Sequence, residues 1–134
     1  MKKTIILLVI ISLSVITLVS CSNTVGNKLT LRNLASNAIY VNFRAELITV
    51  ASGEEVNVVD VDQGSYAYET TFEIPAGVES VEAEGDVAGE IVLKAGTKVL
   101  IVYDSVTLNN IYMLSATMTT SDDLLDEDIN PIDP

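Results

Sequence analysis

Asp60 and Asp62 are the residues whose type and spacing best fit metal chemistry. Side chains alternate along a strand, so a strand through both residues would point the two carboxylates to one face. Gly64, two residues on, would let the chain wrap around a hard cation such as calcium. The spacing of an EF-hand loop is absent, and a solvated strand end is the competing interpretation. We therefore expect no cofactor, with calcium at Asp60 and Asp62 as the alternative.

Three tyrosines are the second feature that bears on binding. Tyr66 and Tyr68 share one face of an expected strand, and Tyr40 lies on another strand. Tyrosine is enriched at binding surfaces because it combines an apolar ring with a polar tip. If Tyr40 lay beside the other two, the three would form an exposed patch for a protein or a glycan. Packing against the core is the competing interpretation.

The composition excludes most enzyme mechanisms. The chain has no histidine, no tryptophan and a single cysteine, Cys21. It therefore lacks the usual general base near neutral pH, the usual zinc ligands and the usual nucleophile pairs. A glycosidase would need two carboxylates held in a cleft, and no motif locates such a pair. We predict that the protein is not an enzyme.

The N-terminus has the pattern of a secretory signal peptide. Lys2 and Lys3 precede an apolar run over residues 5–18, and small residues follow before Cys21. The run is shorter than the roughly 20 residues that a spanning helix needs, so a retained membrane anchor is the weaker interpretation. With no second cysteine in the chain, Cys21 forms no disulfide within it.

The segment Leu18-Val19-Ser20-Cys21 resembles the lipobox of bacterial lipoproteins. This resemblance implies that residues 1–20 are removed and that Cys21 becomes an acylated N-terminus carrying palmitate or a similar chain. It implies a cell-envelope protein held on a membrane by its lipid. Ser22 directly after the cysteine, rather than aspartate, implies the outer membrane if the organism has two membranes.

The net charge of the chain limits the kinds of partner that it is expected to bind. Nineteen acidic and seven basic side chains give a net charge of −12, and removal of Lys2 and Lys3 makes it −14. Nucleic-acid binding requires clustered lysine and arginine, so nucleic acid is excluded as a partner. Solubility on a crowded surface explains this charge best. The expected partners are the membrane, through the lipid, and an envelope protein.

The rest of the chain predicts an all-β domain. Apolar and β-branched runs alternate with turn residues at intervals near ten residues, and no long amphipathic helical window occurs. We expect a single small antiparallel β-sandwich of about seven or eight strands, immunoglobulin-like or transthyretin-like, after an N-terminal signal helix. The expected strands are 28–33, 38–50, 55–61, 66–74, 78–84, 89–94, 98–104 and 111–119.

Two of these segments carry more specific expectations. Within 38–50, one face of the strand would hold Ile39, Val41, Phe43, Ala45 and Leu47. Arg44 would share the other face with Tyr40 and Glu46 and form an ion pair with a residue of a neighbouring strand. Residues 98–103 are apolar on both faces, which predicts the deepest strand, either covered on both sides or passing between layers. The turn phrases at 60–68 and 74–77 are similar to those of secreted bacterial β-sandwich modules.

The domain organisation follows from these patterns. Residues 1–20 are the signal peptide, 21–27 a tether, 28–120 the sandwich, and 121–134 an acidic tail that we expect to be disordered. The mature chain is long enough for one hydrophobic core.

Overall fold

The computed structural model describes residues 26–122, which form two β-sheets and contain no helix. The strands, in chain order, are β1 (Lys28–Asn33), β2 (Ile39–Phe43), β3 (Glu46–Val50), β4 (Glu55–Val59), β5 (Gly64–Phe72), β6 (Ser80–Gly85), β7 (Ala88–Leu93), β8 (Lys98–Leu108) and β9 (Ile111–Thr120). The predicted all-β class is confirmed, with nine strands in this part of the chain instead of seven or eight.

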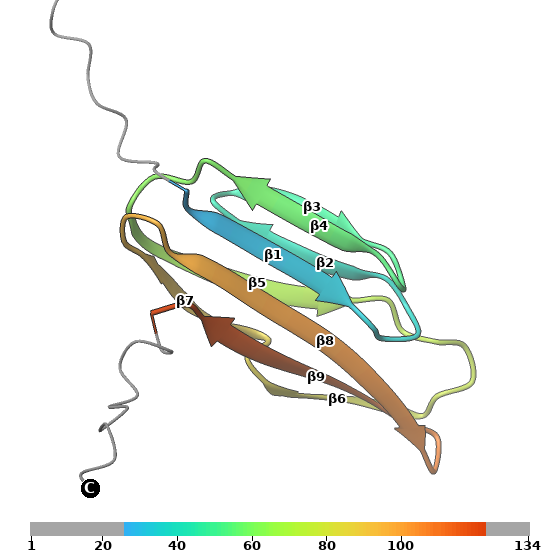
Figure 1. Ribbon diagram of the computed structural model, residues 1–134. Coiled ribbons are helices and arrows are strands. Elements are labelled where there is room, and N and C mark those ends of the chain that lie inside the picture. Colours follow the sequence, from blue (N-terminus) through green and yellow to red (C-terminus); the bar gives the residue numbers. More distant parts are fainter. Residues whose placement is uncertain (1–25, 123–134) are drawn as a thin grey trace, which may run out of the picture.

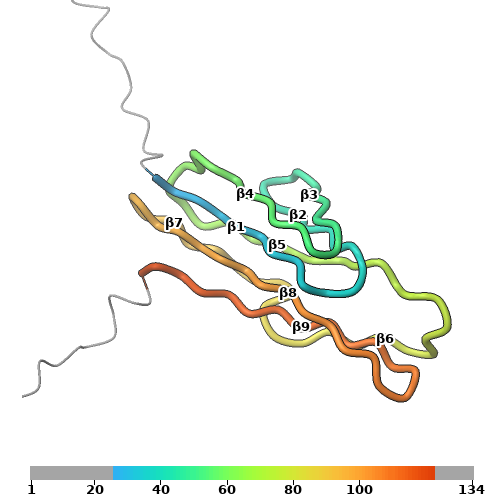
Figure 2. Tube along the Cα trace, turned by 45° about the vertical axis from the view of Figure 1, so that its right-hand side comes forward, coloured from blue at the N-terminus to red at the C-terminus, as the bar shows by residue number. Residues whose placement is uncertain are grey.

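The two sheets face each other as the layers of a sandwich (Figures 1 and 2). One sheet has the order β4-β1-β8-β9-β6 and the other β3-β2-β5-β7. Alternate residues of the strands point inward, except in β6, whose residues are all exposed. The largest fully buried side chains include Tyr103 and Tyr112 from the first sheet and Phe43 from the second. The core is a single apolar layer between the sheets.

The sheets are mixed, which corrects the expectation of a purely antiparallel sandwich. β1 runs parallel to β8, and β6 runs parallel to β9. Both pairs join strands that are separated along the chain by a passage through the other sheet. Side chains alternate with a period of two in parallel and antiparallel strands alike, so the sequence pattern does not distinguish the two directions.

The expected strand 38–50 is a hairpin of two strands, β2 and β3. Arg44 and Ala45 form its two-residue turn, and both have positive φ, 56° and 58°. Such turns match the twist of the strands but usually carry Asn or Gly, so this sequence gave no turn signal. The predicted cross-strand ion pair of Arg44 is not found among the described residues, because Arg44 lies in the turn.

The turn also changes which residues face the core. Ile39, Val41 and Phe43 are buried, as the alternation predicts. Beyond the turn the alternation of inward and outward side chains no longer continues that of β2, because β3 runs back antiparallel to β2 and Leu47 pairs with the outward Asn42. Leu47, expected on the buried face, is therefore 63% exposed.

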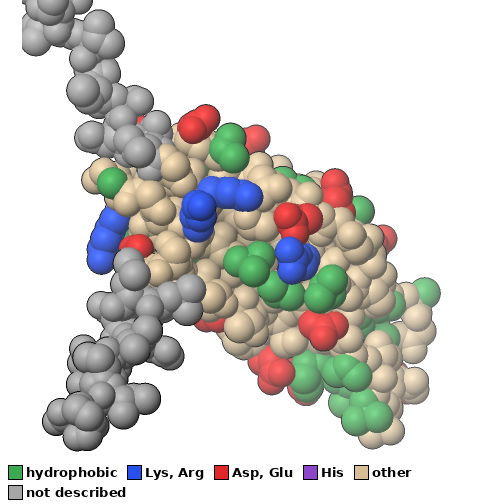
Figure 3. Space-filling view, viewed as in Figure 1, with side chains coloured by type: hydrophobic (Ala, Val, Ile, Leu, Met, Phe, Trp, Pro, Cys, Tyr) green, Lys and Arg blue, Asp and Glu red, His purple; other side chains and the backbone are tan. Residues whose placement is uncertain are grey.

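β8 lies at the centre of the five-stranded sheet, as expected of the deepest segment. Its inward residues Val99, Ile101 and Tyr103 are buried, while Leu100 and Val102 on the other face are only half-buried. The expectation that both faces of this strand are covered is thus wrong for the described residues. Figure 3 shows this outer face, where hydrophobic side chains gather over the β8–β9 hairpin.

Two buried asparagines fix the ends of β1. The side-chain amide of Asn27 donates to Val61 O at 3.0 Å, and its carbonyl accepts from the amide of Thr97 at 2.9 Å. Asn33 donates to Val50 O and to Asn37 O, both at 2.9 Å, and accepts from the Ala35 amide. Buried backbone groups in the loops are satisfied in this way.

Gly85 and Asp86 mark the point where the chain passes from β6 to β7 and changes sheet. Gly85 has φ 74°, and a Cβ at this position would clash with the carbonyl oxygen of Ala116. Asp86 donates its amide to the same oxygen at 2.8 Å, and its carboxylate accepts from the Met118 amide at 2.8 Å. A glycine is required for this close crossing.

Candidate binding hollow on the four-stranded sheet

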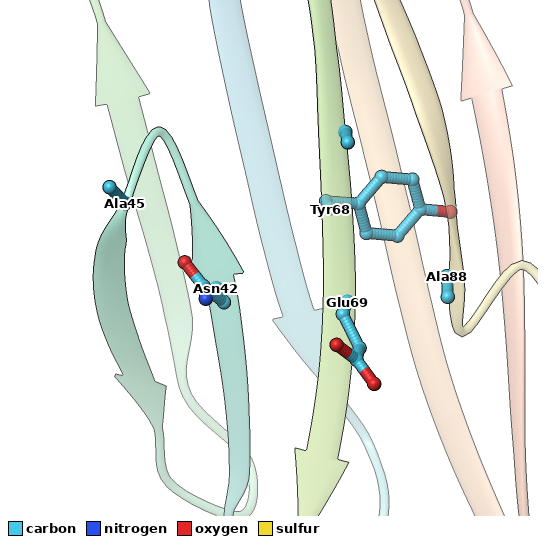
Figure 4. A pocket seen from close by; sticks show the side chains of 6 residues that line it. Asn42, Ala45, Tyr68, Glu69 and Ala88 are labelled. Atoms are coloured by element: carbon cyan, nitrogen blue, oxygen red, sulfur yellow. The ribbon is translucent and has the colours of Figure 1, made fainter.

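The outer face of the four-stranded sheet contains a broad hollow of about 440 Å³ (Figure 4). Its lining residues come from β2, the β2–β3 turn, β5 and β7: Asn42, Ala45, Ala67, Tyr68, Glu69 and Ala88. This volume falls within the roughly 300–1,000 Å³ of ordinary small-ligand sites. The hollow is the candidate binding site in the described part of the chain.

Strand register places the polar residues of the hollow side by side. Asn42 of β2 is the direct cross-strand partner of Glu69 on β5, and Glu69 is in turn the partner of Ala88 on β7. Residues opposite each other on one face of a sheet have Cβ atoms about 5 Å apart. An amide and a carboxylate therefore lie next to each other along one edge of the hollow.

Small side chains make the hollow. Ala67 and Ala88 lie on the outer face of β5 and β7, where larger residues would fill the space. Figure 4 shows Asn42 and Glu69 on neighbouring strands, with Ala88 beyond Glu69 and Ala45 at the hairpin turn. The result is an uncovered alanine floor bordered by two polar groups.

The polar groups of the hollow are free for a ligand. No described residue forms a side-chain hydrogen bond or ion pair with Asn42 or Glu69, and the ion pair found in this part of the chain, Arg32–Glu55 at 2.7 Å, lies on the other sheet. Glu90, in the next row of the same face, is hydrogen-bonded to Ser65. Among the lining residues the carboxylate of Glu69 is thus the charge without a partner in the described part of the chain, and Arg44 lies nearby in the β2–β3 turn.

The three tyrosines do not form one patch, which corrects the first alternative for them. Tyr66 and Tyr68 share the inner face of β5, and Tyr40 points to the outer face of β2, between the buried Ile39 and Val41. Tyr68 is 4% exposed and donates its hydroxyl to Asp86 O at 2.7 Å. Burial, followed by the nearby Asp86 charge, raises the pKa of Tyr68.

Tyr66 packs against the core and also holds the loop between β4 and β5. Its ring packs against Phe43 with ring centroids 5.4 Å apart, and its hydroxyl donates to Asp62 O at 2.8 Å. The interpretation as core packing is therefore correct for Tyr66 and Tyr68.

Asp60 and Asp62 lie beyond the end of β4, not within a strand. Asp60 has φ 55°, both residues are exposed, and Val61 between them is fully buried. The expected strand through both carboxylates is wrong because β4 ends at Val59, where the chain turns to bury Val61. Within residues 26–122 no group of three or more metal-ligating side chains gathers. The calcium alternative stays a prediction.

Other predicted features fall outside the described residues. Cys21, the signal peptide and most of the acidic tail belong to residues 1–25 and 123–134. Over residues 26–122, no helix has the length and apolar character that crossing a membrane requires.

Asn42 and Glu69 were not predicted as a pair. The signal in the sequence was weak: a polar residue on the outer face of each strand, with alanine at 67 and 88 where larger outward residues are common. Their pairing depends on the register between β2 and β5, which the sequence does not show.

Together these features define a small all-β sandwich with a polar hollow on one sheet. No protein-family model matches the chain, and no curated protein matches it significantly.

Proposed function

We propose that this protein is a lipid-anchored cell-envelope lipoprotein with a non-catalytic role in binding or envelope structure. In this proposal Cys21 carries the lipid and the sandwich is displayed at the membrane surface, on the outer membrane where there are two. The partner is another protein of the envelope. The acidic composition, with 19 acidic residues, speaks against nucleic acid.

The observation that supports this proposal best is the small number of residues between Cys21 and the first strand. β1 begins at Lys28, seven residues after Cys21. A fully extended chain spans at most about 3.6 Å per residue, so this tether would hold the sandwich within about 25 Å of the bilayer. Two or three acyl chains would provide a stable anchor, since each buried methylene contributes about 0.8 kcal/mol.

The hollow supports a binding role for the displayed domain. It combines a recess with an amide and a carboxylate, Asn42 and Glu69, that have no side-chain partner among the described residues. Binding sites commonly combine a recess with a few polar groups that set the orientation of the ligand. No feature of the described residues favours calcium binding over this role.

Metabolic labelling with an alkyne analogue of palmitate tests the anchor. We expect the wild-type chain to incorporate the label, Cys21→Ala to lose it completely, and Ser22→Ala, the matched neighbour, to keep it. The label is the required readout, because an unprocessed apolar segment could hold the variant in the membrane by itself. Equal labelling of wild type and Cys21→Ala would overturn the proposal.

A further inference from the structure

We propose that the hollow on the four-stranded sheet is the docking site for an arginine or lysine side chain of a protein partner. This proposal rests on the proposed binding role and specifies the chemistry of that partner. In the docked state the cationic group donates hydrogen bonds to the carboxylate of Glu69 and to the side-chain carbonyl of Asn42. The aliphatic part of the side chain lies on Ala67 and Ala88.

Charge is the first argument for a cation. Glu69 is exposed, has no partner among the described residues, and is the direct neighbour of an amide that can act as an acceptor. The described residues include five cations. Four of them lie on the other sheet or after the far end of β7, away from the row of Asn42, Glu69 and Ala88: Lys28, Arg32, Lys94 and Lys98. The fifth, Arg44, lies in the β2–β3 turn next to Ala45 and forms no ion pair with a described residue. An acidic surface attracts basic partners and raises their rate of association.

Shape is the second argument. An arginine or lysine has a long apolar stem, and it covers apolar surface while its charged head contacts polar groups. The alanine floor of the hollow supplies that surface, and Glu69 lies at its border. Both elements are needed, because an exposed carboxylate on a flat surface forms only weak ion pairs.

The composition of the hollow favours a cationic side chain over a metal ion or a sugar. A divalent cation needs several oxygen ligands, and no group of three metal-ligating side chains occurs in residues 26–122. The aromatic residue of the lining, Tyr68, is buried and hydrogen-bonded to Asp86, so its face is not available for a sugar ring.

Alanine-methyl NMR on the full chain in detergent micelles tests the proposal directly. Ala45, Ala67 and Ala88 report on the hollow, and Ala83 on β6 of the other sheet, which is not part of the lining, is the reference. The probe is N-acetyl-arginine amide, and N-acetyl-citrulline amide is its neutral counterpart of the same shape. We expect saturable shifts of the hollow methyls with the arginine probe, much smaller shifts with citrulline, and none at Ala83.

Two matched pairs of variants separate charge from shape. Glu69→Gln should weaken binding of the arginine probe by about fivefold, whereas Glu82→Gln, on the outer face of the other sheet, should leave it unchanged. Ala67→Leu should fill the hollow and weaken binding with Glu69 intact, whereas Ala83→Leu should not.

Three outcomes would overturn the proposal: no saturable shift, equal binding of arginine and citrulline, or equal weakening by Glu69→Gln and Glu82→Gln. Equal binding of both probes would indicate a neutral polar ligand instead. Acyl labelling of the same protein distinguishes this failure from failure of the anchor. If the protein is acyl-labelled but does not bind the probe, only the docking proposal fails and the proposed anchor stands.

Discussion

The hydroxyl oxygens of Thr70 and Tyr103 lie 2.8 Å apart in the space between the two sheets. Thr70 belongs to β5 of the four-stranded sheet and Tyr103 to β8 of the five-stranded sheet. Both are buried, with Thr70 9% and Tyr103 0% exposed. This hydrogen bond joins the centres of the two sheets, because β5 and β8 are interior strands of their sheets.

Thr70 and Tyr103 should contribute to stability as a coupled pair through this hydrogen bond. Thr70→Val leaves the Tyr103 hydroxyl buried without a partner, which should cost about 1–3 kcal/mol of unfolding free energy. Addition of Tyr103→Phe removes that unsatisfied group, so the double variant should lose less than the sum of the single losses. Urea unfolding of the wild type, the two single variants and the double variant measures the coupling. Strictly additive losses would contradict a coupling between the two residues.

Stability should fall at alkaline pH because of Tyr103. Burial raises the pKa of Tyr103 from 10.0 to about 12. Between these values the folded state retains a proton that the unfolded state has lost, so the stabilisation present below pH 10 decreases as pH rises. We expect a loss of about 1 kcal/mol by pH 11 and about 2–3 kcal/mol above pH 12.

Urea unfolding between pH 8 and pH 11 checks the alkaline effect. Tyr103→Phe should reduce the dependence on pH, whatever its effect on stability at pH 8. Part of the dependence should remain, because burial also raises the pKa of Tyr68. An unchanged slope in Tyr103→Phe would show that Tyr103 titrates normally.

Asn33→Ala should be strongly destabilising. The variant loses three side-chain hydrogen bonds and leaves buried backbone groups of Ala35 and Val50 without those partners. We expect a loss of about 3–5 kcal/mol. Asn57→Ala is the control, because Asn57 is exposed and accepts one hydrogen bond from Thr30, and its loss should stay within about 0.5 kcal/mol.

Hydrogen exchange gives a local check on Asn33. The amide of Ala35 donates to the Asn33 side chain at 2.9 Å and should lose its protection in Asn33→Ala. Retained protection with a full loss of global stability would mean that another acceptor replaces the side chain.

Gly85→Ala should destabilise the fold more than Gly53→Ala. Both glycines have positive φ, 74° and 79°, so alanine is strained at either position. At Gly53 a Cβ meets nothing within 4 Å, whereas at Gly85 it meets the carbonyl oxygen of Ala116. We expect about 1–2 kcal/mol for the strain alone at Gly53 and a larger loss at Gly85. Equal melting temperatures would contradict the close crossing of β6 and β9.

Calcium should not stabilise the protein. Asp60 and Asp62 are exposed on both sides of the buried Val61, and a calcium site needs six to eight oxygen ligands. We expect the same melting temperature with chelator and with millimolar calcium, in wild type and in Asp60→Asn/Asp62→Asn. A rise in melting temperature that the double variant abolishes would establish the calcium alternative.

Much of the fold was predictable from local pattern. β1 has the predicted bounds, and the alternation of buried and exposed residues in β2 follows the sequence. The turn at Arg44 and Ala45 was missed because neither residue type signals a left-handed turn. Parallel pairing of β1 with β8 was missed because strand direction depends on the path of the chain between the sheets.

The candidate site was less accessible to sequence reasoning. Asp60 and Asp62 were considered as a metal site because they are acidic residues close in sequence. In the structure both are exposed, and Val61 between them is the buried residue of that loop. Asn42 and Glu69 are far apart in sequence and common in type, so only the register of β2 and β5 makes them a pair.

The sequence by itself determined the all-β class and, within strands such as β1 and β2, which residues are buried, because the alternation along a strand is a local property of the chain. It also carries Leu18-Val19-Ser20-Cys21, the segment whose resemblance to a lipobox leads to the proposed anchor. The tertiary structure alone decided the mixed strand directions, the burial of Tyr68 and the hollow at Glu69. These depend on contacts between residues distant in sequence, which form only when the two sheets pack together.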